Sequence, residues 1–397
     1  MSDRGTYDVV VVGGGAIGLC CAWRAAERGA RVAVLDRADP PAGATRVAAG
    51  MLAPIGELAF GEPELLQMTL AAARRYPDFV ADLEAASGAR TGYVRHGALH
   101  IALDRDEAAE LRRVHDLQRS HGLGAEWLPP RRCRELEPGL TPSFSGGVYA
   151  PEEAAIDPRR MTAALLDALL AAAVEVRSGV EVTAALLEGD RIEGVRTAAG
   201  EELRAAAVVL ATGAWAGQSE WLPESARPPV RPVKGQIVEL RPVADGTPCE
   251  RIVASERVYL VPRPDGRLIV GATTEERGFD TTVTAGGVHE LLREAYRLLP
   301  DVAEMELVEA MAGLRPGTPD NLPLIGHGAL DGLVLACGHY RNGILMAPLT
   351  GDAVAALLSG EPLPEALAAA EPLRSHFVSP SQTKDERDVG DRAEVGR

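Results

Sequence analysis

Cysteine is scarce and scattered in this 397-residue chain. The five cysteines are Cys20, Cys21, Cys133, Cys249 and Cys337. No two of them stand in a C-x-x-C spacing, and an odd, dispersed set encodes neither a disulfide framework nor a zinc knuckle. The eight histidines add no metal motif, because His96 and His100 stand four residues apart without the glutamate of an H-E-x-x-H site. We therefore expect no bound metal.

Positive charge is also in short supply. The chain has 41 lysines and arginines against 57 aspartates and glutamates, which gives a formal net charge of −16. A protein that binds a phosphate backbone needs a cationic surplus to release counterions, so we expect no nucleic-acid partner. No long apolar run opens the chain either, since residues 7–12 are followed at once by glycine. That run is too short for a signal segment or a membrane span, and we expect a soluble, cytoplasmic protein with no membrane partner.

Lysine is rarer than any other charged residue. Lys234 and Lys384 are the only lysines among the 41 basic residues. In a chain so rich in arginine, a lysine retained within a folded segment suggests a need for an ammonium rather than a guanidinium. Lys234 is as readily the partner of a structural ion pair as a residue of a functional site.

The first forty residues have the pattern of a βαβ unit. Residues 7–12 form a β-branched run typical of a buried parallel strand. Residues 16–28 have apolar side chains at helical spacing and stop at Gly29, which indicates a helix with a glycine cap. Residues 31–35 predict a second strand that ends at Asp36.

Three helices are predicted further along. Residues 64–86 predict a helix interrupted at Pro77. The pair Asp157-Pro158 predicts a helix start, with the aspartate as the cap and the proline in the first turn. Residues 349–358 predict a closing helix that begins near Pro348.

Hairpin-rich stretches separate the strand and helix units, as around the turn at residues 264–266. This alternation predicts one nucleotide-binding domain assembled from discontinuous pieces, with a mainly antiparallel β-sheet domain inserted between them. The expected fold class is α/β, α+β overall. The expected division assigns residues 1–88, 146–225 and 311–377 to the first domain and 89–145 and 226–310 to the second, with a polar, disordered tail at 378–397.

A glycine-rich turn joins the first predicted strand to the first predicted helix. The segment from Gly13 to Gly18 satisfies G-x-G-x-x-G, and Asp36 closes the next strand. Gly13 permits the tight turn, Gly15 lets the backbone approach a pyrophosphate, and Gly18 allows close helix packing. The helix N-terminus supplies N–H donors for phosphate, and Asp36 can accept the ribose hydroxyls. This context predicts a dinucleotide site rather than a glycine turn without a ligand.

Dinucleotide binding alone does not separate NAD from FAD. A second glycine-bracketed turn, residues 337–343, joins a predicted strand to the closing helix. Such a turn can bring backbone donors to an isoalloxazine ring, where charge develops on reduction. An ordinary surface turn is the alternative.

Seven segments support the choice of FAD. They are VVVVGGGAIGL near the start, ATRVAAGMLAP (44–54), ATGAW (211–215), RPVKGQ (231–236), VYLVPRPDGRLIVGAT (258–273), AGLRPGTPDNLPLIG (312–326) and GHYRNGILMAP (338–348). Together they resemble the D-amino-acid oxidase superfamily, and more narrowly its glycine oxidase branch of thiamine biosynthesis. The resemblance spans about residues 7–376, and the last three segments are the most specific.

The resemblance implies a Rossmann-like FAD-binding domain, a substrate domain built on an antiparallel sheet, and a homo-oligomer, often a tetramer. It also implies a set of FAD contacts. These are Gly13, Gly15, Ala16, Ile17, Gly18, Asp36, Arg37, Ala44, Thr45, Ala49, Gly50, Met51, Val180, Gly213, His339, Tyr340, Arg341, Asn342, Gly343, Ile344 and Leu345. The family's pocket position at Thr274 has a hydroxyl here, where a relative has an apolar side chain.

The same resemblance places Arg315 as the clamp on a substrate carboxylate, assisted by Tyr259 and Arg341, with Met51 near the flavin. A planar, permanently charged donor suits a carboxylate better than an ammonium does. Without the resemblance, Arg315 would be a surface or structural arginine as readily as a site residue, and Tyr259 a core or interface residue.

The implied activity is FAD-dependent oxidative deamination of glycine or another small amino acid. The products would be the 2-oxo acid, ammonia and hydrogen peroxide, with O2 as the acceptor and with a role in thiamine (thiazole) biosynthesis. Two alternatives stay open from the sequence. One is a D-amino-acid dehydrogenase or oxidase of broader specificity, and the other is a non-catalytic flavin-binding subunit of a complex.

Overall fold

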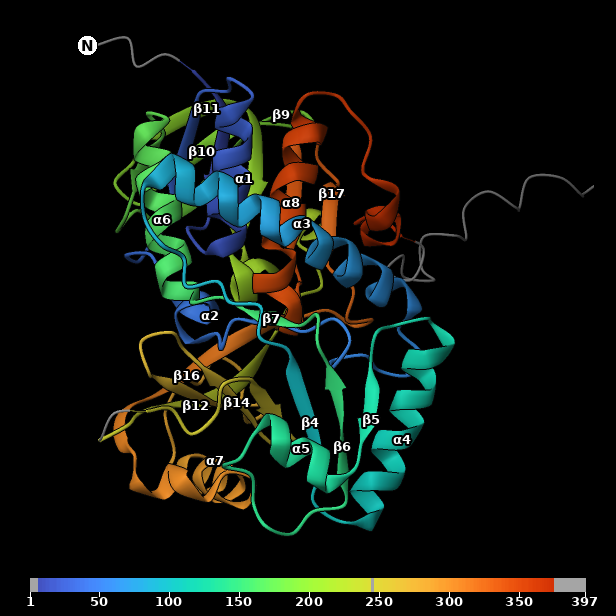
Figure 1. Cartoon of the computed structure of the whole chain (residues 1–397). Helices are drawn as coiled ribbons and strands as arrows, with labels where there is room; N and C mark the ends of the chain where they lie inside the picture. The colour runs from blue at the N-terminus through green and yellow to red at the C-terminus, as the bar shows by residue number, and fades with distance from the viewer. Residues whose placement is uncertain (1–5, 244–245, 375–397) are drawn as a thin grey trace, which may run out of the picture.

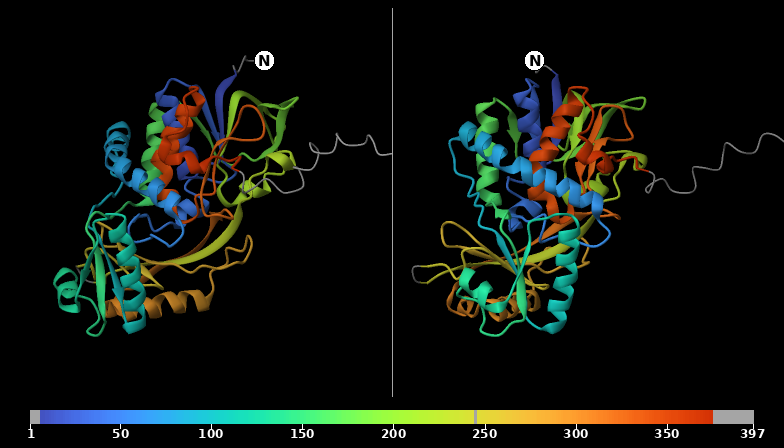
Figure 2. Two further views of the ribbon diagram at one scale, coloured as in Figure 1. Left: turned by 90° about the vertical axis from the view of Figure 1, so that its right-hand side faces the viewer. Right: turned by 45° about the vertical axis from the view of Figure 1, so that its right-hand side comes forward.

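The computed structural model describes residues 6–243 and 246–374. The predicted disordered tail at 378–397 lies outside these residues. Within the described part, the elements form two stacked regions, each built around one large β-sheet (Figure 1). Views from two further directions show the same two regions and the narrow zone where they meet (Figure 2).

The first sheet contains the N-terminal βαβ unit that the sequence predicts. Its strand order is β17-β18-β11-β1-β2-β8, and β1, β2, β8, β11 and β18 run parallel. The bounds are β1 Tyr7–Val12, β2 Val32–Leu35, β8 Glu175–Arg177, β11 Glu202–Leu210, β17 Leu324–His327 and β18 Leu333–Cys337. Two antiparallel strands, β9 (Val182–Glu188) and β10 (Arg191–Thr197), extend it beside β11.

Four helices cover one face of this sheet. They are α1 (Ala16–Glu27), α3 (Pro63–Ser87), α6 (Pro158–Ala171) and α8 (Gly343–Leu358). Helix α1 packs between α6 and α8, and α3 crosses over α6 and α8 as the outer layer (Figure 1). Because the parallel strands are buried on both faces, they consist of near-continuous apolar residues, as in the run from Val9 to Val12.

The second sheet is mainly antiparallel and has the order β16-β12-β15-β14-β13-β4-β6-β5. Its bounds are β4 Ala98–Ala102, β5 Glu126–Leu128, β6 Gly146–Ala150, β12 Arg231–Arg241, β13 Ile252–Ala254, β14 Tyr259–Pro262, β15 Leu268–Gly271 and β16 Glu306–Gly317. The expected division assigns residues 146–225 and 311–377 to the nucleotide-binding domain. The structure pairs β6 and β16, which fall at the edges of those ranges, with strands of the second sheet.

Further elements complete the described chain. The helices are α2 Gly43–Val47, α4 Arg105–Ser120, α5 Pro130–Leu136 and α7 Ala285–Leu298, and β3 (Met51–Leu52) pairs with β7 (Ala154–Ala155) between the two regions. The 3₁₀ turns are Gly213–Gln218, Glu224–Ala226, Pro300–Glu304, Tyr340–Asn342 and Glu365–Ala370. No helix in residues 6–243 or 246–374 is long and apolar enough to cross a membrane.

Several sequence predictions are confirmed. Asp157 caps α6 by accepting hydrogen bonds from the backbone N–H groups of Arg159 (3.0 Å) and Arg160 (3.3 Å). Strands β14 and β15 form the hairpin predicted around residues 264–266. The predicted α/β class, with parallel and antiparallel sheets in separate regions, matches the observed arrangement.

Two helix predictions were wrong at prolines. Helix α3 continues through Pro77, because core side chains on both sides of the proline, such as Tyr76 and Phe79, pack on the same cluster. Helix α8 begins at Gly343, five residues before Pro348. Pro348 lacks the N–H that would bond the carbonyl of Ile344, and the Tyr76 hydroxyl donates to that carbonyl instead at 3.0 Å.

Candidate active site

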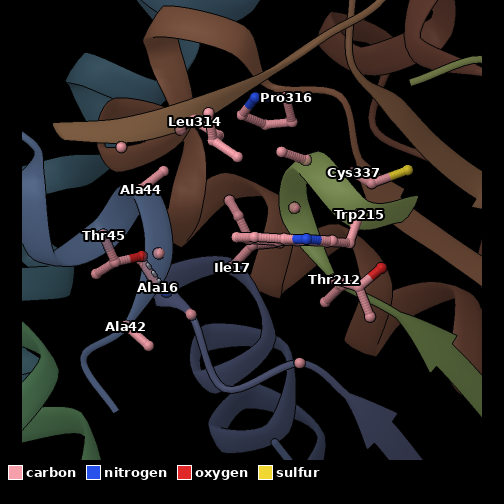
Figure 3. A pocket seen from close by; sticks show the side chains of 18 of the residues that line it. Ala16, Ile17, Ala42, Ala44, Thr45, Thr212, Trp215, Leu314, Pro316 and Cys337 are labelled. Atoms are coloured by element: carbon pink, nitrogen blue, oxygen red, sulfur yellow. Dashed lines mark hydrogen bonds between the residues drawn. The ribbon is translucent and has the colours of Figure 1, made fainter. Parts of the chain in front are cut away.

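A large cavity, with a volume of about 840 Å³, lies where the two regions meet. The carboxyl ends of β1, β2, β11 and β18 open onto it from the first sheet, and β12, β14 and β16 line it from the second. Figure 3 shows Ala16, Ile17 and Thr45 on one side of this space and Leu314 and Pro316 on another. Ligands of parallel α/β sheets bind at this end of the strands.

The glycine-rich turn fits a dinucleotide phosphate. At Gly13, with φ +118°, an added Cβ would lie 2.3 Å from the carbonyl oxygen of Ala211. At Gly18, it would lie 1.9 Å from the carbonyl oxygen of Gly13, so α1 packs directly against the turn. Gly15, at the N-cap of α1, has no side chain that could cap the helix, and this end of α1 faces the cavity. The positive helix end at this point suits a pyrophosphate.

Asp36 ties the glycine turn to the second strand. Its Oδ2 accepts a hydrogen bond from the Gly14 N–H at 2.6 Å, and its Oδ1 accepts one from the Ala38 N–H at 2.8 Å. Each carboxylate oxygen has a second lone pair, so Asp36 can also accept a ribose hydroxyl from the cavity that it lines. Nearby, Thr45 Oγ1 accepts from the Ala16 N–H at 3.1 Å (Figure 3).

The strip Ala49-Gly50-Met51 forms the floor between the two regions, and one buried arginine holds it. Arg263 donates to the carbonyl oxygens of Ala49 (2.5 Å) and Ile156 (2.8 Å). Burial lowers the pKa of Arg263 to about 10, so the guanidinium stays charged at neutral pH. The strip is thereby fixed from the second sheet while its own residues line the cavity.

Arg315 and Tyr259 form a polar end of the cavity. Arg315 lies on β16 opposite Val233 of β12, and its Nη1 donates to the carbonyl oxygen of Thr273 at 3.1 Å. Burial raises the pKa of the Tyr259 hydroxyl, and the nearby Arg315 charge opposes this rise. The hydroxyl therefore remains a neutral donor beside a permanent cation, a pair that suits a carboxylate.

Two glycines make room for these side chains. A Cβ at Gly235 would lie 2.4 Å from Nη1 of Arg315, and a Cβ at Gly271 would lie 2.5 Å from the hydroxyl oxygen of Tyr259. Gly235 and Gly271 therefore shape the polar end through the space that they leave open.

The turn at residues 338–343 forms another wall of the cavity. His339 is 2% exposed, and its Nε2 lies 2.9 Å from the Thr350 hydroxyl. Burial lowers the pKa of His339 to about 3, so its ring is neutral across the physiological range. Arg341 is exposed at the cavity edge, with its guanidinium 5.6 Å from the ring centroid of Tyr340.

These features agree with the family comparison. Residues 8–357 match the family described as DAO, FAD dependent oxidoreductase. The chain belongs to this family. FAD is its cofactor, and the glycine turn, the α1 N-terminus and the Asp36 carboxylate described above fit such a dinucleotide.

Relatives within the DAO family include proteins named for glycine oxidation. The chain is 37% identical over 376 residues to the bifunctional protein ThiO/ThiG of Trichormus variabilis, covering 94% of this chain and 54% of that protein. The chain thus spans about half the length of that relative. It is 36% identical over 360 residues to glycine oxidase of Geobacillus kaustophilus, covering 89% of this chain and 93% of that protein.

Solved structures of the family have the same fold. The crystal structure of glycine oxidase from Geobacillus kaustophilus superposes with a TM-score of 0.86 at 34% identity, covering 93% of this chain and 99% of that one. The crystal structure of iminodiacetate oxidase from Chelativorans sp. BNC1 gives 0.82 at 28% identity, covering 92% and 98%. The predicted α/β fold class and family are confirmed.

Most of the predicted DAO-family site residues line the cavity. Gly18, Asn342 and Leu345 do not. Gly18 lies beneath Gly13, Leu345 is buried in the helical core, and Asn342 lines a small neighbouring pocket. The placement of the other predicted residues around one cavity supports the roles that we propose for them below.

The expectation for Thr274 was wrong in its geometry. Thr274 is exposed and does not line the cavity. Side chains alternate along an extended segment, and Thr273 is the residue that faces β12, where its hydroxyl accepts from the Gln236 N–H at 2.9 Å. Thr273 also supplies the carbonyl that holds Arg315.

Sequence reasoning left several cavity residues unassigned, among them Trp215 and Glu57. Trp215 packs under the guanidinium of Arg37, 4.5 Å from the ring centroid, and its place in the quoted segment ATGAW was an available signal. Glu57 enters the cavity from a loop that Glu153 holds by accepting from the Ile55 N–H at 3.1 Å. Burial raises the pKa of Glu57, and the charge of Arg341 opposes the rise. No sequence pattern points to Glu57.

Proposed function

We propose that this chain oxidises glycine or another small 2-amino acid to the corresponding imine, which water converts to the 2-oxo acid and ammonia. One observation supports this most strongly. The dinucleotide turn and the Arg315–Tyr259 pair open onto the same cavity, so a cofactor and a small carboxylate can bind next to each other. The similarity to proteins named glycine oxidase and ThiO/ThiG supports glycine as the substrate and thiamine biosynthesis as the pathway.

The residues of the chain divide this work between them. When bound, FAD would supply a hydride acceptor: the Cα–H would leave with two electrons, the amine would lose one proton as the imine forms, and the two electrons and two protons would convert O2 to hydrogen peroxide. Gly15, Ala16 and Asp36 hold the dinucleotide part, and the strip Ala49-Gly50-Met51 and the turn at 338–343 flank the rest. Arg315 binds the substrate carboxylate in two-pronged fashion, with Tyr259 as a second donor and Arg341 at the edge. Fixing the carboxylate orients the Cα–H, which is a positioning effect.

The two sheets support a division of labour between domains. We propose that the first sheet and its helices form the cofactor-binding domain and that the second sheet forms the substrate domain, with β6 and β16 on the substrate side. A cytoplasmic location and an assembly of four copies are further proposals, and the assembly rests on the resemblance alone.

Anaerobic mixing tests the proposed function. The purified protein should be yellow, and glycine should bleach its visible absorbance when O2 is excluded. Admitting O2 should restore the colour and produce hydrogen peroxide. A bleached protein that O2 does not reoxidise would indicate a dehydrogenase with another acceptor. No bleaching with any of a panel of small amines would contradict the proposal and indicate a non-catalytic flavin protein.

The FAD should be bound without a covalent link. Cys337 and His339 are the only cysteine and histidine among the described residues that line the cavity. Burial raises the pKa of the Cys337 thiol to about 12, so no thiolate forms at neutral pH. The ring of His339 is engaged with Thr350. Acid precipitation should release the flavin into the supernatant, and colour that stays with the pellet would show this expectation to be wrong.

A further inference from the structure

Lys234 is nearly inaccessible to solvent, although its ammonium group lies near the edge of the substrate domain. Its side chain is 1% exposed, and its Nζ lies 2.7 Å from Oδ2 of Asp280 and 3.9 Å from an oxygen of Glu275. The hydrogen bond from the Lys234 ammonium lowers the pKa of the Asp280 carboxyl, so this carboxylate stays ionised at neutral pH. A buried ammonium is stable only when such partners are present.

The partners of Lys234 lie on one segment, residues 272–284, which connects β15 to α7 and runs beside β12. The backbones of Lys234 and Glu275 exchange two hydrogen bonds, of 3.0 Å and 2.9 Å. Gln236, two residues further along β12, donates to Glu275 Oε1 at 2.7 Å and to the Thr284 hydroxyl at 3.1 Å. Buried side chains of β12 therefore hold both ends of segment 272–284.

This segment provides the nearer of the two backbone acceptors that orient Arg315. Nη1 of Arg315 donates to the carbonyl oxygen of Thr273 at 3.1 Å and, over a longer distance of 3.5 Å, to that of Lys234 itself. The Thr273 hydroxyl donates to Glu275 Oε1 at 2.6 Å, which fixes the backbone at this point. A movement of segment 272–284 would thus change the direction in which the guanidinium points.

We propose that Lys234 is a positioning residue for the substrate clamp. Through its ion pair with Asp280, it holds segment 272–284 against β12 and thereby keeps the Arg315 guanidinium in place for a carboxylate. Lys234 does not line the cavity, so it acts without touching substrate or cofactor. The inference rests on the proposed function of Arg315 as a carboxylate clamp.

Two variants and a matched control test it. Lys234→Met removes the ammonium, and Asp280→Asn removes its partner, whose side chain is 41% exposed. Arg231 and Glu276 form an exposed ion pair between the same strand and the same segment, so Arg231→Met is the control. Acetate, which has the carboxylate but no amine, reports on the clamp without turnover when it is titrated by calorimetry against the FAD-loaded protein.

Both test variants should lower the affinity for acetate about tenfold, which corresponds to the loss of one hydrogen bond. They should raise KM for glycine to a similar extent. They should change kcat less than about twofold, because the lost interaction stabilises the bound substrate and the transition state equally. The double variant should bind acetate no more weakly than Lys234→Met alone, because the two residues act as one unit. FAD content should stay normal in all variants, and Arg231→Met should bind acetate like the parent protein.

Unchanged acetate affinity and KM in Asp280→Asn would overturn the proposal and leave Lys234 a purely structural residue, whatever happens to the melting temperature. If Lys234→Met fails to fold, Asp280→Asn decides alone. A parent protein that binds acetate but oxidises no amine would refute the proposed function, while the acetate titrations would still test the positioning role.

Discussion

Replacement of Arg315 by leucine should lower kcat/KM for glycine by about a hundredfold to ten-thousandfold. The leucine removes two charge-assisted hydrogen bonds to the substrate carboxylate, each worth about 1.5–3 kcal/mol. The FAD content should stay near that of the parent, since the guanidinium is assigned to the substrate. Steady-state assays of hydrogen peroxide, together with the flavin absorbance per protein, measure both quantities.

Two comparisons sharpen this test of Arg315. Arg315→Lys should recover only part of the lost activity, because an ammonium keeps the charge but cannot make the two-pronged contact. Methylamine, which lacks a carboxylate, should react far more slowly than glycine with the parent protein. Parent-like kcat/KM in Arg315→Leu, or equal reactivity of methylamine and glycine, would show that Arg315 is not the clamp.

Gly235→Ala should lower kcat/KM for glycine by about tenfold to a hundredfold while leaving the fold and the FAD content intact. The added Cβ would lie 2.4 Å from Arg315 Nη1. Since the atom in the way is the end of a flexible side chain, the arginine can swing aside and the backbone need not move. The effect should therefore appear in substrate binding, with little change in the melting temperature.

Gly286→Ala is the matched control for Gly235→Ala. Gly286 lies in α7, and a Cβ added there meets no atom within 4 Å. In an Arg315→Leu background, Gly235→Ala should lower kcat/KM little further, because the side chain that it displaces is already gone. An equal loss from Gly235→Ala in both backgrounds would mean that the glycine acts through something other than Arg315.

The features predicted from sequence were those that depend on neighbouring residues. The turn from Gly13 to Gly18 was recognisable because a strand, three spaced glycines and a helix follow one another directly, and dinucleotide binding needs just that local order. The cap at Asp157 and the hairpin of β14 and β15 were predictable for the same reason. Arg315 was identified through resemblance, since its surroundings in sequence say little about its acceptors.

Features that join distant segments escaped prediction. The start of α8 depends on Tyr76, which satisfies the carbonyl of Ile344 from a helix 268 residues away in sequence. Glu57 is brought to the cavity by Glu153, 98 residues beyond the Ile55 amide that it binds. Neither pair has a spacing that a sequence pattern could show, because tertiary packing alone creates them.

The grip of Arg263 bears on how a substrate can reach the cavity. One guanidinium from the second sheet binds the carbonyls of Ala49 and Ile156 on two separate backbone strips next to the first sheet. Rotation of one domain against the other would break both hydrogen bonds at once and leave a buried cation without these acceptors. Hinge opening is therefore costly here. We expect the amino acid and the product to enter and leave through small local movements near the exposed Arg341, without a separation of the two domains.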